Sequence, residues 1–281
     1  MEQIIFVVWR ESVEALLVIG LMHALLKQQD NSGLGLRYLW WGIAGGLVLA
    51  LTLAISLLTM SSVMGGNSSV IFSTFLVLVA SILIVQMVLW MRTNGRHLHS
   101  HFKQKSNEAM ASGKYWSIAV LAAVALGREG SETVIFLYGM SSAQQAASDW
   151  VHFASAVAVA FALAGFTYWL LQASGRWLSW RLFFRLSEAL LLLLAASLIV
   201  TGVDRLIGLG WLPAGLDPVW DTSNILDDSS RFGSILSALT GYRAYPALTD
   251  IVAYFGFWII VATLLVRQNQ KLQKKEATDN T

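Results

Sequence analysis

Two short strings of charged residues stand inside otherwise apolar stretches of this 281-residue sequence. Residues 10–14 and residues 128–132 both read Arg-Glu-x-x-Glu. Each residue of a helix turns the chain by about 100°, so the Arg and both Glu of one string fall within an arc of about 100°. Carboxylates grouped in this way are hard oxygen ligands that suit iron, manganese, magnesium or calcium. Each string therefore predicts one charged stripe on one helix.

Two such stripes that face each other bring together four carboxylates and two guanidinium groups, with a net charge of −4 + 2 = −2. The residues are Glu11, Glu14, Glu129, Glu132, Arg10 and Arg128. The i,i+4 spacing predicts that each Arg pairs with the second Glu of its own string. A permanently charged Arg keeps such carboxylates ionised at membrane depth. Salt bridges that only tie helices together are the alternative, but the repetition of the string favours an ion site.

The elements that must position these residues are membrane-spanning helices. The chain is 56% hydrophobic and 13% charged, whereas soluble domains are about 25% charged. Its apolar residues form long runs, and about 18 of them in succession are enough to cross a bilayer. Cysteine is absent, which excludes disulfides and thiolate metal sites.

We predict an all-α polytopic membrane protein in which a single integral membrane domain covers residues 1–281. Seven transmembrane helices are expected at Ile4–Leu26, Tyr38–Met60, Val70–Met91, Tyr115–Gly139, Val151–Leu171, Leu182–Leu206 and Leu248–Val266. An outer loop of about residues 208–247 precedes the last span (248–266), and a cytoplasmic tail of residues 267–281 follows it.

Loop charges predict an N-out, C-in orientation in the cytoplasmic (inner) membrane. With the N-terminus outside, most of the 19 Lys and Arg residues face the cytoplasm, and only Arg205, Arg231 and Arg243 lie outside. The basic residues are spread over the loops between spans, so the expected surroundings are a lipid bilayer and not a nucleic acid.

The two charged strings also indicate an internal repeat. Equivalent positions are separated by three spans, so the two copies cross the membrane in opposite directions. Residues 4–91 and 115–206 would form inverted three-helix repeats, with the seventh helix added. In transporters of this plan the substrate site lies at the repeat interface near the middle of the membrane.

Weaker signals lie outside the spans. Asp221, Asp227 and Asp228 are candidates for outer cation capture, although Asp is also common in turns. The sequence from residue 229 to Thr240 predicts a short amphipathic helix capped by Ser229 or Ser230.

A second weak signal is a run of three histidines in the inner basic loop. His97, His99 and His101 could receive an ion at the inner exit, since imidazole binds ferrous iron, but a solvated loop explains their spacing equally simply.

The pair of Arg-Glu-x-x-Glu motifs in the first and fourth of seven spans resembles the oxidase-dependent iron transporters. This family includes the fungal high-affinity iron permeases and the bacterial EfeU-type permeases. The resemblance covers nearly the whole chain, including the stretch from Gly241 to Pro246 before the last span.

The resemblance implies an iron permease and not an enzyme. Iron, ferrous or ferric, would be the transported substrate, with no permanently bound cofactor. The four motif Glu residues (Glu11, Glu14, Glu129 and Glu132) would bind iron in transit, with Arg10 and Arg128 as companions. It also implies a periplasmic iron-oxidising or iron-delivering partner, either a cupredoxin-like protein, a haem peroxidase or both.

Three other functions stay open on the residues alone. The same carboxylates would serve a transporter of protons or of another divalent cation such as manganese. A membrane di-iron enzyme usually has His three residues after a ligating Glu, whereas Glu14 and Glu132 occupy that position here. A purely structural subunit would leave the repeated motif unexplained.

Overall fold

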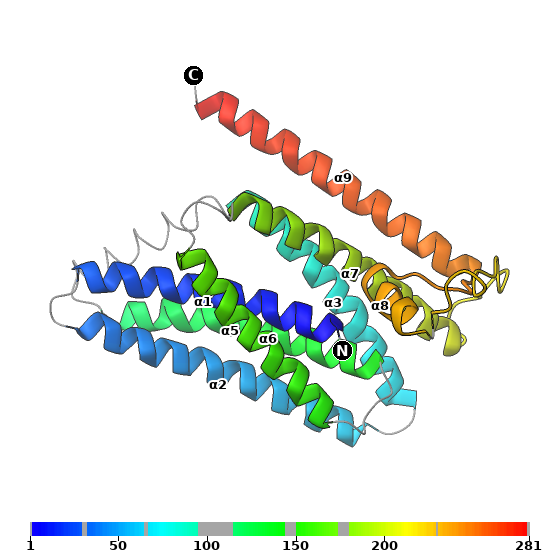
Figure 1. The fold of residues 1–281 in the computed structure, drawn as a ribbon, viewed down its shortest axis with the longest axis horizontal. Helices are drawn as coiled ribbons and strands as arrows, with labels where there is room; N and C mark the ends of the chain where they lie inside the picture. Colours follow the sequence, from blue (N-terminus) through cyan, green and yellow to red (C-terminus); the bar gives the residue numbers. More distant parts are fainter. Residues whose placement is uncertain are drawn as a thin grey trace. The chain divides into compact units, whose positions relative to one another are not determined.

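The structure is a computed structural model that describes residues 2–29, 33–64, 67–94, 115–143, 150–173, 180–228 and 230–279 (Figure 1). Within these ranges the chain forms eight helices and no strand. The helices are α1 (Glu2–Gln29), α2 (Leu34–Val63), α3 (Asn67–Asn94), α5 (Trp116–Ala143), α6 (Trp150–Ala173), α7 (Trp180–Gly208), α8 (Arg231–Thr240) and α9 (Leu248–Asp279).

Five of these helices are long and apolar enough to cross a membrane by length and composition. The candidate spans are Leu34–Val63, Asn67–Thr93, Phe153–Leu170, Arg185–Gly208 and Leu248–Gln270, in α2, α3, α6, α7 and α9 respectively. Helices α1 and α5 are also 28 residues long, but each carries the three charges of its motif. The protein is therefore a helical membrane protein with several spans.

The chain divides into two compact units, and neither coincides with a predicted repeat. The first unit contains α1, α2, α5 and α6, and the second contains α3, α7, α8 and α9. Each unit thus takes helices from both halves of the sequence.

In the first unit, small residues bring α2 and α5 close together along their length. A Cβ atom at Gly46 would lie 2.9 Å from the Cβ of Leu126, and one at Gly130 would lie 2.7 Å from the Cβ of Ala50. Gly42 lies against Ala119 in the same way. Residue numbers rise together on the two helices, so α2 and α5 run parallel. Such close approach through Gly and Ala is the usual way in which helices pack in membranes.

Helices α1 and α5 run in opposite directions. A core cluster joins Met22 and Leu26 of α1 to Ile118 and Ala122 of α5, with Leu39 of α2 completing it. The charged motifs meet further along the same two helices, near the N-terminal end of α1. Figure 1 shows α1, α2 and α5 lying lengthwise beside one another, with α6 crossing α1.

In the second unit, α3 and α7 also run in opposite directions. Ser73 on α3 accepts a 3.0 Å hydrogen bond from Arg205 on α7, and Ser81 donates to the carbonyl oxygen of Ala195 at 2.8 Å. At the other end of the pair, Arg92 forms an ion pair with Glu188. Helix α7 is the most enclosed of the candidate spans. In its apolar 18-residue stretch 61% is buried, whereas the corresponding value for α2 is 11%.

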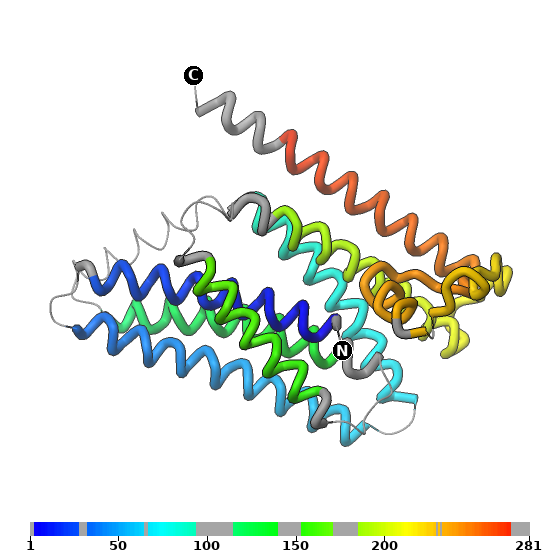
Figure 2. The backbone as a smooth tube through the Cα atoms, in the orientation of Figure 1, coloured from blue at the N-terminus to red at the C-terminus, as the bar shows by residue number. Residues whose placement is uncertain are grey.

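The connection between α7 and α9 is ordered by hydrogen bonds and carries the short helix α8 (Figure 2). Ser230 caps α8 by accepting a 3.0 Å hydrogen bond from the backbone N–H of Gly233, which confirms the predicted capped helix. The Tyr242 hydroxyl donates to the carbonyl oxygen of Leu226 at 2.8 Å and lies 2.6 Å from the Thr222 hydroxyl. These contacts join the two ends of residues 222–242 to each other.

Candidate ion-binding site

Helix α1 presents a fully buried arginine between two carboxylates. The Nη1 atom of Arg10 lies 2.8 Å from Oε1 of Glu11, and its Nη2 atom lies 2.5 Å from Oε1 of Glu14. The Arg10 side chain is 0% exposed, whereas the side chains of Glu11 and Glu14 are 2% and 14% exposed. The predicted i,i+4 pair is present, and the adjacent Glu11 adds a second ion pair that the spacing rule did not include.

Helix α5 presents the second motif, and its predicted i,i+4 pair is also present. The Nε atom of Arg128 donates to Oε1 of Glu132 at 2.9 Å. Two neighbouring hydroxyls bond back to this helix: Ser131 donates to the Arg128 carbonyl oxygen and Thr133 to that of Glu129, both at 2.8 Å. Serine and threonine bonded in this way satisfy helix carbonyls locally. The sequence analysis did not identify Ser131 and Thr133 as part of the site.

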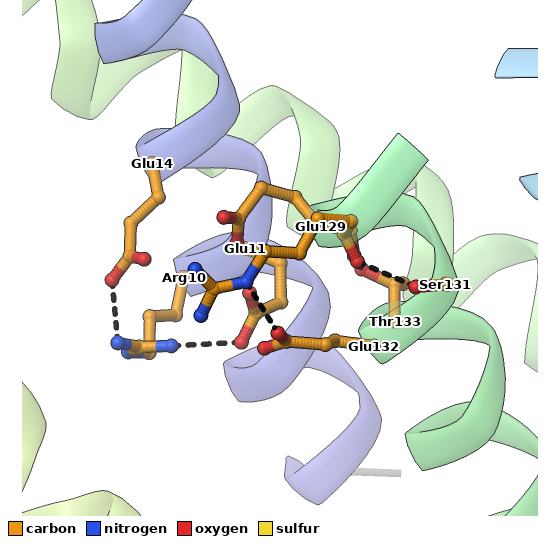
Figure 3. A network of polar contacts seen from close by, with 8 residues as sticks. Arg10, Glu11, Glu14, Glu129, Ser131, Glu132 and Thr133 are labelled. Atoms are coloured by element: carbon orange, nitrogen blue, oxygen red, sulfur yellow. Dashed lines mark hydrogen bonds and ion pairs between the residues drawn. The ribbon is translucent and has the colours of Figure 1, made fainter. Parts of the chain in front are cut away.

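The two motifs meet, and three of their carboxyl groups converge. One oxygen atom each from Glu11, Glu14 and Glu129 lies within 4.8 Å of the other two. Figure 3 shows Glu11 and Glu14 on α1 facing Glu129 and Glu132 on α5, with Arg10 held between its two partners. An ion placed among these atoms would receive oxygen ligands from two helices that are distant in sequence.

Several carboxylate oxygens in this cluster are buried and still available. The Oε2 atoms of Glu11, Glu129 and Glu132 have no hydrogen-bond partner among the residues that the structure describes. Leaving a buried acceptor unsatisfied is costly, and a cation that supplies the missing interaction would relieve that cost. The donor set consists of oxygen atoms, which suits a hard cation.

The two motifs differ in how deeply they are enclosed. The Arg128 side chain is 36% exposed, in contrast to the completely enclosed Arg10. Glu132 and Glu14 are partly exposed, and Glu11 is almost fully enclosed. The cluster is therefore closed around Arg10 and Glu11 and accessible on the side of Arg128.

Helix α6 holds α1 in place on either side of the motif. The indole N–H of Trp9 donates a 2.9 Å hydrogen bond to the Thr167 hydroxyl. Further along α1, Gly20 leaves room for the hydroxyl of Tyr168, which a Cβ atom at that position would displace. Sequence analysis did not find these contacts, because nothing in the spacing pairs residues of the first and fifth predicted spans.

The acidic residues predicted for outer capture lie in the second unit and have structural partners. Asp221 is exposed and accepts hydrogen bonds from the Ser223 backbone N–H and hydroxyl, at 2.9 and 2.7 Å. These bonds favour the ionised form and lower the pKa of Asp221.

The neighbouring pair of acids is tied to the same segment. Asp228 accepts a long hydrogen bond of 3.5 Å from the Ala244 backbone N–H, and the Asp227 carbonyl oxygen accepts from Ser230. Both residues thus help to order the turn before α8. His97, His99 and His101 lie outside the described residues.

Comparison with known proteins points to one transporter family. The model of the family described as "Iron permease FTR1 family" matches residues 1–271. The chain is similar to "Ferrous iron permease EfeU" from Escherichia coli O6:K15:H31 (strain 536 / UPEC), with 25% identity over 253 residues that cover 89% of this chain and 90% of that protein. It is similar to the protein of the same name from Yersinia pestis, with 25% identity over 263 residues covering 92% and 90%. No solved structure matches the chain.

Proposed function

We propose a route for the transported ion in this chain, which belongs to the iron permease FTR1 family and is a transporter, not an enzyme. Iron crosses the membrane through the carboxylate cluster that α1 and α5 form. Glu11, Glu14 and Glu129 bind the ion in transit, and Glu132 joins them when it leaves Arg128. The proposal rests on the convergence of one buried and two partly buried carboxyl groups, whose oxygen atoms lie within 4.8 Å of one another.

The arginines pair with the carboxylates of the site between transport events. Arg10 holds Glu11 and Glu14 while no ion is bound, so that these carboxylates are not left unpaired in a buried place. An arriving cation competes with Arg10 and Arg128 for the same oxygen atoms, and the arginines take the carboxylates back when the ion leaves. Four carboxylates and two arginines carry a net charge of −2, which a ferrous ion neutralises.

We propose that α1 and α5 span the membrane together with the five apolar helices, which makes seven spans. Helix direction supports this number. If α5 did not cross the membrane, α3 and α7 would cross in the same direction, yet their contacts run antiparallel. Helix α1 packs antiparallel to α5 along its length and so lies at the same depth.

The same directions support an inverted repeat. The first spans of the two proposed repeats are α1 and α5, and the third spans are α3 and α7. Both pairs are antiparallel, as repeats of opposite topology require. With most Lys and Arg residues on the inner side, the N-terminus lies outside and the C-terminus in the cytoplasm of a cell inner membrane.

Delivery of iron to this chain requires a source outside the membrane. The relatives are named as ferrous iron permeases, and we propose ferrous iron as the carried form here as well. A periplasmic partner, cupredoxin-like or a haem peroxidase, would deliver it to the permease. A partner that instead oxidised the iron would make ferric iron the carried form. Asp221, Asp227 and Asp228 form an acidic outer surface that attracts the cation.

The test is radioactive iron uptake in cells that lack other iron transport, with Glu14→Gln and Glu132→Gln compared with wild type. Loss of one ligating carboxylate is expected to reduce uptake by about 10–100-fold or more, since even indirect changes at metal sites have effects of that size. Glu188→Gln is the matched control, because it also removes one ion-paired carboxylate from a helix of this protein. Normal uptake by both motif variants, at wild-type membrane levels, would show that the cluster is only a structural bridge.

A further inference from the structure

The segment between α7 and α9 begins with a part whose exposed side chains are mostly apolar. Residues 209–220, which we name the collar, follow directly after the candidate span Arg185–Gly208. Their exposed large side chains are Trp211, Leu216, Val219 and Trp220. Asp217 is the only charged residue in this part of the sequence. Such a surface is unusual for a loop that only faces water.

Backbone hydrogen bonds hold the collar beside the first turn of α9. The Leu248 N–H donates to the Leu216 carbonyl oxygen at 2.9 Å, and the Val219 N–H donates to that of Pro246 at 3.0 Å. The Thr249 hydroxyl donates to the Pro213 carbonyl oxygen at 2.6 Å. The candidate span of α9 begins at Leu248, so these bonds hold the collar level with the end of that span.

The collar continues an apolar surface that already belongs to a span. Leu248 and Val252 at the start of α9 are exposed, as are Leu216 and Trp211 in the collar. Tryptophan is enriched at the boundary of a bilayer, because its ring is apolar and its N–H finds polar partners there. The backbone bonds to α9 also satisfy polar groups that would be costly to leave unpaired near lipid.

The rest of the connection has a different surface. Beyond the collar, the turns before α8 carry the exposed carboxylates of Asp221 and Asp227 beside the exposed Ile225, so this surface is mixed and acidic. Tyr242 ties this polar part to itself through its contacts with Thr222 and Leu226. Figure 2 shows the whole connection as the yellow to orange coil between α7 and α9. Acidic side chains are thus more frequent after Trp220, since residues 209–220 contain only Asp217 whereas residues 221–228 contain Asp221, Asp227 and Asp228.

We propose that the collar lies in the outer headgroup layer of the bilayer, with Trp211, Leu216 and Trp220 in contact with lipid. This inference rests on the proposed spanning of α7 and α9, but it does not depend on the route of the ion. The collar anchors the connection at the membrane surface. The acidic turns before α8 are thereby kept in the water next to the membrane.

The absence of native cysteine allows a direct test. Leu216→Cys and Trp220→Cys would each carry a nitroxide spin label in the full chain, reconstituted in phosphatidylethanolamine and phosphatidylglycerol liposomes. Power saturation would compare collisions with oxygen, which concentrates in lipid, and with a neutral nickel chelate, which stays in water. Ile259→Cys on α9 is the lipid reference and Asn224→Cys is the water reference, since both residues are exposed.

The labels at positions 216 and 220 are expected to lose most of the nickel collisions seen at position 224 and to show a higher oxygen-to-nickel ratio. A ratio equal to that at position 224 would overturn the proposal, because it would show that the collar faces water and not lipid. Iron uptake by each labelled variant checks that it is folded. Because the collisions do not depend on transport, failure of the carboxylate route would leave this result unchanged.

Discussion

Replacing Arg10 by glutamine is expected to destabilise the protein much more than the same change at Arg128. The two arginines occupy equivalent positions in the two motifs, so their sequences alone suggest equal effects. In the structure, Arg10 is completely enclosed and pairs with Glu11 and Glu14, whereas the Arg128 side chain, which pairs with Glu132, is 36% exposed.

The size of the difference follows from burial. Removing one partner of a buried ion pair leaves an uncompensated charge and costs about 3–5 kcal/mol. Because Arg128 is more than one third exposed, water screens its pair with Glu132, and exposed pairs contribute about 0–1 kcal/mol. The two variants should therefore differ by at least about 2 kcal/mol in the free energy of unfolding.

Equilibrium unfolding of the purified variants in mixed detergent micelles measures this difference. The double variant Arg10→Gln/Glu14→Gln should recover part of the stability that Arg10→Gln loses, because it also removes one of the unpaired carboxylates. Arg128→Lys keeps the charge and should stay close to wild type in stability.

Two results would refute the reasoning. Equal destabilisation by Arg10→Gln and Arg128→Gln would mean that the enclosure of Arg10 does not hold in the folded protein. If the double variant is no more stable than Arg10→Gln alone, the destabilisation does not come from an unpaired Glu14 carboxylate.

Three further expectations concern packing, capture and ligand binding. Gly130→Ala should lower the free energy of unfolding by about 1–3 kcal/mol and reduce uptake, because the new Cβ would lie 2.7 Å from that of Ala50. Gly165→Ala is the control, since a Cβ at Gly165 would meet nothing within 4 Å. An equal effect of both variants would contradict the close packing. Replacing Asp227 and Asp228 together by Asn should raise the apparent KM for iron uptake, whereas an unchanged KM removes their electrostatic role. Ferrous iron at a hundredfold excess over its Kd should add about 2.7 kcal/mol to the unfolding free energy of the wild type, and no shift would argue against a site in the folded state.

Much of the candidate site was predictable from local sequence. The Arg-Glu-x-x-Glu spacing predicts both i,i+4 pairs, and Arg10–Glu14 and Arg128–Glu132 are found as ion pairs. Helix geometry alone determines which side chains share a face, so this prediction needs no knowledge of the fold. The capped helix α8 was predictable for the same reason, since Ser230 bonds only three residues along the chain.

The spans were predictable where composition is uniform. Apolar runs identify α2, α3, α6, α7 and α9, because hydropathy depends only on consecutive residues. Charge inside α1 and α5 weakens the same signal in the helices that carry the motifs.

Long-range packing decided the rest. The sequence alone established the two charged stripes, the apolar helices and the lack of thiol ligands, because each depends on residue type and local spacing. Only the tertiary structure decided that Glu11, Glu14 and Glu129 converge, that Arg10 is enclosed while Arg128 is partly exposed, and that Trp9 bonds to Thr167. These features depend on which helices pass close to one another, and the small residues between α2 and α5 permit that approach without specifying the partner.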